Sequence, residues 1–193
     1  MEFEEMLERH HANDAGFCRH YMTLYSIVLG MEAKEVFEFG SGYSSKTILK
    51  ALSKTGGHLY SCDMRKLKET GKLYDIEDEE MKEQAESWTY ILGKSQDVQD
   101  KFPDVLFDVV LHDASHKWQY VKKDLENIIP KMKNGSILLV HDTNHPTHNY
   151  RLEKSIEWLK KDHECITLPY GYGLSIIKIN NDNESVVIDW RKG

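Results

Sequence analysis

Cysteine is scarce in this chain, and the three that occur, Cys18, Cys62 and Cys165, are widely spaced. Their number is odd and no CxxC pair exists, so neither a disulfide framework nor a cysteine-ligated zinc site is indicated. Free cysteines are typical of a reducing compartment. We therefore expect a cytoplasmic protein.

The sequence also lacks long apolar runs and basic character. No apolar segment approaches the roughly 20 residues that span a bilayer. The acidic segment Met1–Glu5 lacks the basic and apolar regions of a signal peptide. The formal net charge is −7, whereas nucleic acids and anionic membranes attract basic surfaces. We therefore expect neither a nucleic acid nor a membrane as partner.

The 193 residues suit one domain. We expect N-terminal helices over residues 1–34, an α/β core over 35–180 and a C-terminal tail over 181–193. Apolar residues recur at helical spacing before Gly30, and strand-like and helix-like segments alternate after it. Strands are predicted at 35–39, 58–62, 88–92, 107–112, 136–140, 165–168 and 174–179, with a further short strand at 186–190.

Helices are predicted between these strands, near 44–52, 118–129 and 152–159, with partial helix over 64–87. The dipeptide Asn134-Gly135 predicts a turn before the fifth strand, and the short link at 169–173 favours an antiparallel hairpin. The alternation predicts a Rossmann-like α/β fold, a doubly wound, mostly parallel seven-stranded sheet with an antiparallel C-terminal hairpin.

Polar or glycine-rich segments follow the predicted strands, which matters because ligands of such sheets bind beyond the carboxyl ends of the strands. Chemistry is therefore expected at these strand ends. The segments are Glu38–Gly42, Asp63, Gly93–Asp97, His112–His116 and His141–His145.

The first of these segments belongs to a glycine-rich turn, Glu38–Ser44, that opens a helix. Gly40 and Gly42 would let the backbone approach a ligand and adopt positive φ. Three cofactors fit the turn. The first is ATP, held by a phosphate-binding loop at Gly40–Thr47, although Ser45 stands where the second glycine of that loop belongs. The second is a dinucleotide, although Ser45 also replaces the last glycine of the dinucleotide-binding fingerprint. The third is an adenosine-containing cofactor.

Asp63 favours a nucleoside cofactor over the phosphate-binding loop. It ends the second strand, 23 residues after Gly40, where a carboxylate can accept both ribose hydroxyls. A phosphate-binding loop has no use for it. The third strand ends in Gly93–Asp97, whose polar groups could reach an adenine edge.

These residues resemble class I S-adenosylmethionine-dependent methyltransferases, over roughly residues 35–180. Val36–Gly42 is similar to the first motif of that fold, Asp63 to its ribose-binding acid, and Gly93–Asp97 to the adenine-contacting segment of catechol O-methyltransferases. The terminal hairpin resembles the reversed last strand of the fold.

Within that class the chain most resembles metal-dependent small-molecule O-methyltransferases, including the macrocin type. The likeness rests on the blocks Phe107–His116 and Ile137–Thr143. It implies that Asp113 and Asp142 bind a divalent cation and that His116 is the general base. Catechol-type enzymes have asparagine where Thr143 stands, and macrocin-type enzymes have glutamate where His141 stands, so the third metal ligand is open.

We therefore expect metal-assisted O-methylation of a small hydroxylated acceptor, with Mg²⁺ or another divalent cation, in a protein that could form a homodimer. An ATP-binding phosphotransferase using residues 40–47 and a non-catalytic S-adenosylmethionine-binding module are the alternatives. His141, Thr143 and His145 are further candidates for contact with substrate or metal. The residues expected to hold the cofactor are Glu38, Gly40, Ser41, Gly42, Asp63, Ser95, Gln96 and Asp113.

Overall fold

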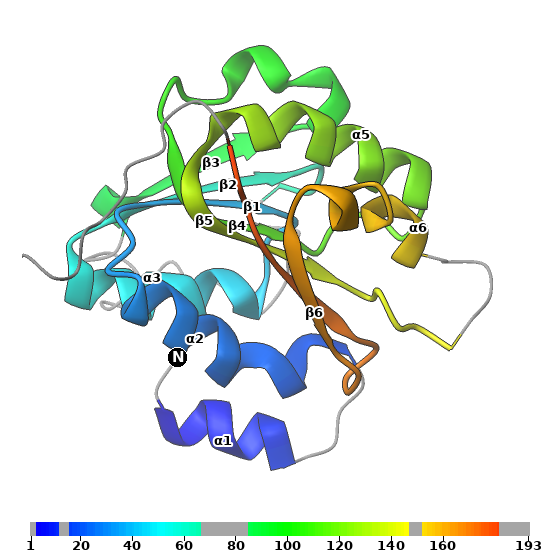
Figure 1. Ribbon diagram of the computed structural model, residues 1–193. Helices are drawn as coiled ribbons and strands as arrows, with labels where there is room; N and C mark the ends of the chain where they lie inside the picture. The colour runs from blue at the N-terminus through cyan, green and yellow to red at the C-terminus, as the bar shows by residue number, and fades with distance from the viewer. Residues whose placement is uncertain (1–2, 12–15, 67–84, 147–151, 182–193) are drawn as a thin grey trace, which may run out of the picture.

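A computed structural model of the chain describes residues 3–11, 16–66, 85–146 and 152–181. A seven-stranded sheet forms its middle layer, with α1, α2 and α3 on one face and α5 and α6 on the other (Figure 1). The strands are β1 (Glu35–Phe39), β2 (His58–Asp63), β3 (Trp88–Leu92), β4 (Phe107–His112), β5 (Met132–His141), β6 (Glu164–Leu168) and β7 (Leu174–Lys178).

Five α-helices are described, together with short 3₁₀ segments. The α-helices are α1 (Phe3–His11), α2 (Tyr21–Gly30), α3 (Tyr43–Thr55), α5 (Trp118–Ile128) and α6 (Glu153–Ile156). The 3₁₀ segments are η1 (Gly16–His20), η3 (Ala85–Ser87), η4 (Ser95–Asp97), η5 (Gln99–Lys101), η6 (Ile129–Lys131) and η7 (Leu159–Lys161).

The strand order, β3-β2-β1-β4-β5-β7-β6, confirms the predicted fold class. β1 to β5 pair in parallel, whereas β7 is antiparallel to both β5 and β6. Since β7 reverses direction, the link between β6 and β7 lies at the same edge as the carboxyl end of β5. The backbone N–H of Asn144 accordingly donates to the carbonyl oxygen of Tyr172, at 2.8 Å.

Two local predictions need correction. Asn134-Gly135 is not a turn before the fifth strand but lies inside β5, where pairing shifts from Phe107↔Met132 to Val109↔Ile137. The extra residues form an irregularity that Gly135, with φ of +79°, accommodates. The predicted helix at 152–159 is interrupted into α6 and η7. Residues 67–84 of the partly helical segment, and the strand predicted at 186–190, lie outside the described residues.

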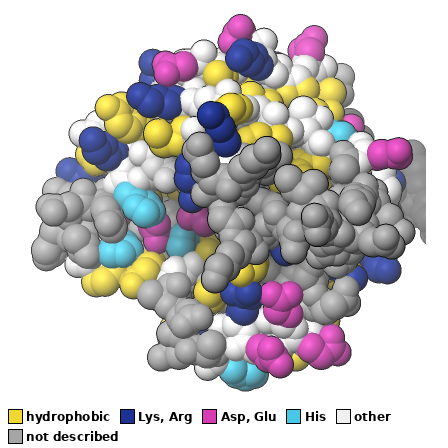
Figure 2. Space-filling view, turned by 180° about the vertical axis from the view of Figure 1, so that it is seen from behind, with side chains coloured by type: hydrophobic (Ala, Val, Ile, Leu, Met, Phe, Trp, Pro, Cys, Tyr) yellow, Lys and Arg dark blue, Asp and Glu magenta, His cyan; other side chains and the backbone are white. Residues whose placement is uncertain are grey.

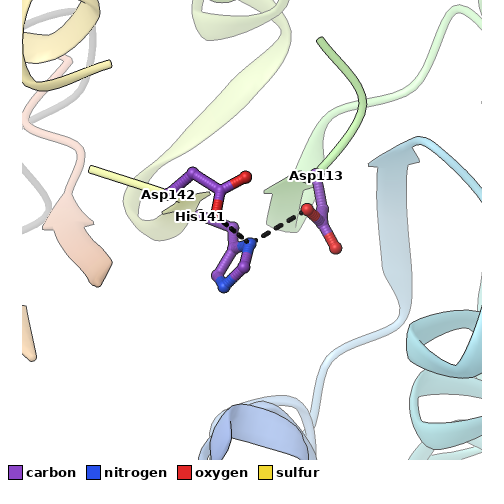
Figure 3. A group of neighbouring side chains, drawn as sticks. All are labelled: Asp113, His141 and Asp142. Carbon is purple, nitrogen blue, oxygen red and sulfur yellow. Dashed lines mark hydrogen bonds and ion pairs between the residues drawn. The ribbon is translucent and has the colours of Figure 1, made fainter. Parts of the chain in front are cut away.

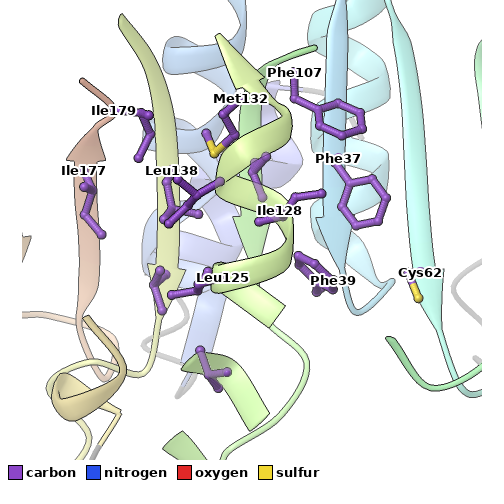
Figure 4. Close-up of a cluster of buried hydrophobic side chains, with 14 of the residues drawn as sticks. Phe37, Phe39, Cys62, Phe107, Leu125, Ile128, Met132, Leu138, Ile177 and Ile179 are labelled. Carbon is purple, nitrogen blue, oxygen red and sulfur yellow. The ribbon is translucent and has the colours of Figure 1, made fainter. Parts of the chain in front are cut away.

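The core has two parts, one on each face of the sheet. Figure 4 shows the part beneath α5, where Phe37, Leu125 and Ile177 pack together. The other part joins α2 and α3 to the opposite face. Because side chains alternate along a strand, Phe37 and Phe39 face α5, whereas Val36 and Glu38 face α3. This alternation directs the side chain of Glu38, the first residue of the glycine turn, towards α3.

Candidate active site

The turn after β1 brings the backbone of the next strand close to Gly40. Gly40 has φ of +84°, and a Cβ there would lie 2.3 Å from the carbonyl oxygen of Asp113. The Asp113 N–H donates to the Phe39 carbonyl at 2.9 Å. Gly42 differs: its φ of −173° is extended, so of the two glycines only Gly40 adopts a positive φ. Nothing in the described structure lies within 4 Å of a Cβ at Gly42, which leaves that side of the turn open to a ligand.

Glu38 lies below the turn, fully buried, and accepts hydrogen bonds from three serine hydroxyls. The donors are Ser44 at 3.1 Å, Ser61 at 2.6 Å and Ser45. Burial raises the pKa of Glu38 to about 8, although the three hydroxyls oppose the rise. The carboxyl group therefore fastens the start of α3 to β1 and β2 from beneath.

Contacts of Ser45 and Thr47 within the turn disfavour a phosphate-binding loop. Its hydroxyl accepts the N–H of Gly42 at 3.2 Å, so this amide is already used within the turn. The Thr47 hydroxyl donates to the Tyr43 carbonyl of its own helix at 3.1 Å. A phosphate loop needs free amides curled around the anion and a hydroxyl for its metal. The Gly42 amide is thus unavailable to an anion, and the Thr47 hydroxyl is turned towards its own helix.

Asp63 ends β2 beside the turn, with its side chain almost entirely buried. Its Oδ2 accepts the N–H of Ser41 at 2.9 Å, and its Oδ1 accepts the N–H of Arg65 at 2.8 Å. Burial alone would raise the pKa of Asp63, but the hydrogen bonds from Arg65 and Ser41 hold it below its usual value. Asp63 is therefore an ionised acceptor at the edge of the turn.

The segment after β3 contacts a residue that the sequence analysis missed. The Gln96 amide donates to the Ser95 hydroxyl at 2.8 Å and to Asp124 Oδ1 at 2.7 Å. Asp124 Oδ2 lies 3.2 Å from Nε2 of His112, and both of these side chains are buried. An aspartate in the inward-facing row of α5, beside Val121, was the available signal. Asp124 therefore links the ends of β3 and β4.

Two acids and a histidine meet where β4 and β5 end (Figure 3). His141 Nδ1 lies 3.1 Å from Asp113 Oδ1 and 3.3 Å from Asp142 Oδ1. In the described part of the chain, the ligand atoms of these three side chains all lie within 4.8 Å of one another. Asp142 adopts φ of +61°, a left-handed conformation that aspartate tolerates better than most residues.

Two members of this group, His141 and Asp142, have strongly shifted pKa values. Burial opposes protonation of His141, but the two carboxylates outweigh it and raise its pKa to about 10. Burial would raise the pKa of Asp142, whereas hydrogen bonds from His116 and His141 bring it well below its usual range. His141 Nε2 lies 2.8 Å from the Gly171 carbonyl oxygen, which can only accept a hydrogen bond. Nε2 therefore carries a proton, and Nδ1 is the nitrogen that faces the acids.

His116 approaches this group from the solvent side. Its Nε2 lies 2.9 Å from Asp142 Oδ2, and its side chain is 48% exposed. The hydrogen bond to Asp142 raises the pKa of His116, against the opposing effect of burial. His116 is thus the ring in this cluster that a dissolved molecule can reach.

The other two candidates after β5 are placed differently. The Thr143 hydroxyl is buried 2.7 Å from the Ser175 hydroxyl, which ties it to β7. The ring of His145 lies 4.2 Å from the ring of Tyr172, beside the β6–β7 link. Both residues therefore contact the terminal hairpin. His145 does not belong to the group of possible metal ligands found among the described residues.

The N-terminal region contributes aromatic contacts that the sequence did not reveal. The ring centroids of Phe17 and His20, both in η1, lie 5.0 and 5.5 Å from that of His141. Burial, together with the charge of His141, lowers the pKa of His20 to about 4. A neutral wall therefore covers one side of His141.

The visible rear face of the molecule carries charges of both signs. Figure 2 shows lysine and arginine side chains interspersed with acidic ones among the described residues, and histidine and acidic side chains gathered at the left of the view. None of the described helices combines the length and the apolar character needed to cross a membrane.

Comparison with known proteins identifies the family. A family model described as a methyltransferase domain matches residues 37–143, more than half of the chain. The chain therefore belongs to the methyltransferase-domain family, and its fold is that of class I S-adenosylmethionine-dependent methyltransferases, as predicted. The chain is also 31% identical over 78 residues to the uncharacterized protein y4gI of Sinorhizobium fredii, and spans 9% of the length of that relative.

Solved structures share the fold at low identity. A Staphylococcus aureus protein assigned provisionally as a caffeoyl-CoA O-methyltransferase has a TM-score of 0.71 and 18% identity, with 93% of each chain covered. The O-methyltransferase TomG from Streptomyces achromogenes, in complex with S-adenosylmethionine, has a TM-score of 0.67 and 16% identity, with 92% of this chain and 89% of that one covered. An O-methyltransferase from Bacillus cereus, in complex with S-adenosylhomocysteine, has a TM-score of 0.62 and 16% identity, with 91% and 90% covered.

Proposed function

We propose that this protein transfers a methyl group from S-adenosylmethionine to a hydroxyl group of a small molecule, assisted by a divalent cation and by His116. One observation carries the proposal. The Asp113 backbone packs directly against Gly40. The acid and histidine cluster, which consists of Asp113, His116, His141 and Asp142, therefore adjoins the glycine-rich turn Glu38–Ser44, here called the cofactor turn. A methyl donor in the turn and an acceptor at the cluster would thus be neighbours, as a displacement reaction requires.

The residues around the turn fit the cofactor. S-adenosylmethionine, when bound, supplies a sulfonium methyl group that a nucleophilic oxygen can attack. The extended backbone at Gly42 leaves room for its amino-acid end, and the ionised Asp63 can accept hydrogen bonds from its ribose. Ser95 and Gln96 stay candidates for the adenine edge. Glu38 acts from below, by holding the turn in shape through Ser44 and Ser45.

The donor set of Asp113, His141 and Asp142 fits a divalent cation. In a neutral His141, the Nδ1 lone pair would face two carboxylates at 3.1 and 3.3 Å, which is unfavourable unless a proton or a cation lies between them. A bound cation would lower the pKa of an acceptor hydroxyl. The imidazole nitrogen shifts the preference from Mg²⁺ towards manganese, iron or zinc. His141 thus becomes the third ligand that the sequence left open.

His116 is suited to take the acceptor's proton. Its ring is half exposed, and its bond to Asp142 at 2.9 Å fixes the ring beside the acids. In its neutral form, a histidine so placed can remove a proton, and its raised pKa makes that form a stronger base. The negative charge of Asp142 then stabilises the imidazolium that forms.

Calorimetry and activity measurements test the proposal. We expect the full-length protein to bind S-adenosylhomocysteine and not ATP. With a panel of catechols and sugars as acceptors and each divalent cation in turn, His116→Ala and Asp142→Asn should lose at least about 100-fold in turnover while retaining cofactor binding. The controls are His58→Ala, at the amino end of β2 and so at the opposite end of the strands from the site, and the fully exposed Asp104→Asn.

Three results would count against parts of this proposal. Binding of ATP in place of S-adenosylhomocysteine would overturn the cofactor, and unchanged turnover in His116→Ala would overturn the base. Cofactor binding with no transfer to any acceptor would favour a non-catalytic module. Homodimer formation stays a prediction, which light scattering checks.

A further inference from the structure

We propose that the Arg65 side chain and the ribose of the cofactor are mutually exclusive partners of Asp63, so that the cofactor binds only after Arg65 has turned away. The inference rests on the proposed function, which puts a ribose at Asp63. It concerns a contact inside the chain that competes with the ligand. The argument comes from the hydrogen bonds around one carboxylate.

A carboxylate offers about four acceptor positions, two on each oxygen. All four positions of Asp63 are taken. The Ser41 and Arg65 backbone N–H groups take one on each oxygen, at 2.9 and 2.8 Å. Arg65 Nε takes the second on Oδ1 at 3.2 Å, and Arg65 Nη2 takes the second on Oδ2 at 2.8 Å. A new donor must therefore displace an existing one.

The two side-chain donors are the ones that can leave. Ser41 N–H is fixed by the glycine turn, and Arg65 is held through its own carbonyl, which accepts the Tyr90 hydroxyl at 2.6 Å. The guanidinium is different, because the Arg65 side chain is 54% exposed whereas that of Asp63 is 5% exposed. A change of rotamer would move it into solvent without moving the backbone. It would free one position on each oxygen of Asp63.

Those two positions match a ribose. A ribose carries two neighbouring hydroxyl groups, each able to donate one hydrogen bond, and a carboxylate can accept both, one on each oxygen. The guanidinium makes the same pair of contacts through Nε and Nη2. Its Nη2 also donates to the Ser41 carbonyl at 3.1 Å, so it lies over the turn itself. Arg65 therefore imitates the diol at the place where the diol would bind.

The test is the affinity for S-adenosylhomocysteine, measured by calorimetry on the full-length protein. Arg65→Met should bind about 3- to 10-fold more tightly than the wild type, because partly exposed ion pairs of this kind contribute modestly. Raising the salt concentration should tighten binding to the wild type, since it weakens the competing ion pair, and should leave Arg65→Met unaffected. Lys66→Met, which removes the same charge one residue away, should behave as the wild type.

The outcomes separate the two proposals. If S-adenosylhomocysteine binds neither the wild type nor Arg65→Met, the proposed function fails. If it binds both equally, or binds Arg65→Met more weakly, the cofactor stands and the competition by Arg65 is overturned. Arg65→Gln, a second variant, keeps a polar side chain and should also bind more tightly than the wild type. Circular dichroism confirms that each variant is folded.

Discussion

Replacing Gly40 by alanine should destabilise the fold, whereas the same change at Gly42 should not. At Gly40, φ is +84° and the new Cβ would lie 2.3 Å from the Asp113 carbonyl oxygen, against 3.4–4 Å for ordinary contact. The left-handed backbone costs a non-glycine residue about 1–2 kcal/mol. Relieving the clash costs about 1–3 kcal/mol more. Together these give about 2–5 kcal/mol, a large share of the ~5–15 kcal/mol that stabilises a typical domain.

Gly42→Ala is the matched control. Its φ is −173°, and its Cβ would meet no described atom within 4 Å. Its free energy of unfolding should change by no more than about 0.5 kcal/mol. Urea denaturation measures both variants, and thermal melting should show Gly40→Ala lower by about 5–15 °C. A Gly40→Ala variant as stable as Gly42→Ala would refute the close approach of the two backbones. Calorimetry on the folded Gly42→Ala variant then asks separately whether a cofactor uses the open side of the turn.

Three further predictions concern polar groups that are buried or partly buried. The pKa of Glu38 is raised from 4.5 to about 8. The wild type should therefore lose up to about 5 kcal/mol of stability as pH rises through that window. Urea denaturation at pH 5 and pH 9 should show this loss in the wild type and not in Glu38→Gln. The pKa of Asp108 is lowered, because hydrogen bonds from Lys133 and two backbone N–H groups outweigh the effect of burial. The stability that Asp108 contributes is present above its pKa in the unfolded chain and is lost as pH falls through its pKa in the folded protein. Asp108→Asn should therefore be less stable than the wild type by about 1 kcal/mol at pH 7, and should lose less stability on acidification. Asp124→Ala leaves the buried His112 without its carboxylate partner, so the free energy of unfolding, measured by chemical denaturation, should fall by about 2–4 kcal/mol. Equal stability of Asp124→Ala and Asp124→Asn would contradict that contact.

The fold could be predicted because its signals are local. The runs 88–92 and 107–112 are the strands β3 and β4 with the same bounds. Alternation of strands and helices sufficed for a parallel sheet. Sheet geometry predicted chemistry at the carboxyl ends of the strands. The family resemblance added that Asp113 after β4 and Asp142 after β5 act together, and the two acids lie on either side of His141.

The features that could not be predicted from the sequence depend on contacts that no local sequence pattern encodes. Arg65 lies two residues from Asp63, but only the turn of the chain after β2 brings its guanidinium back onto the carboxylate. Asp124 meets Gln96 across 28 residues, through the packing of α5 on the sheet. The irregular pairing within β5 likewise follows from its neighbours. Tertiary packing, rather than periodicity, decides each of these features.

The position of β7 between β5 and β6 determines the order in which parts of the site can form while the chain is being synthesised on the ribosome. The carbonyl of Gly171, which orients the ring of His141, belongs to the link that leads into β7. Until that link has been synthesised, β5 exposes an unpaired edge and His141 lacks this partner. The cofactor turn draws on β1, β2 and the start of α3, which emerge much earlier. The nascent chain is thus expected to complete its nucleoside-binding end first and its acid and histidine cluster last.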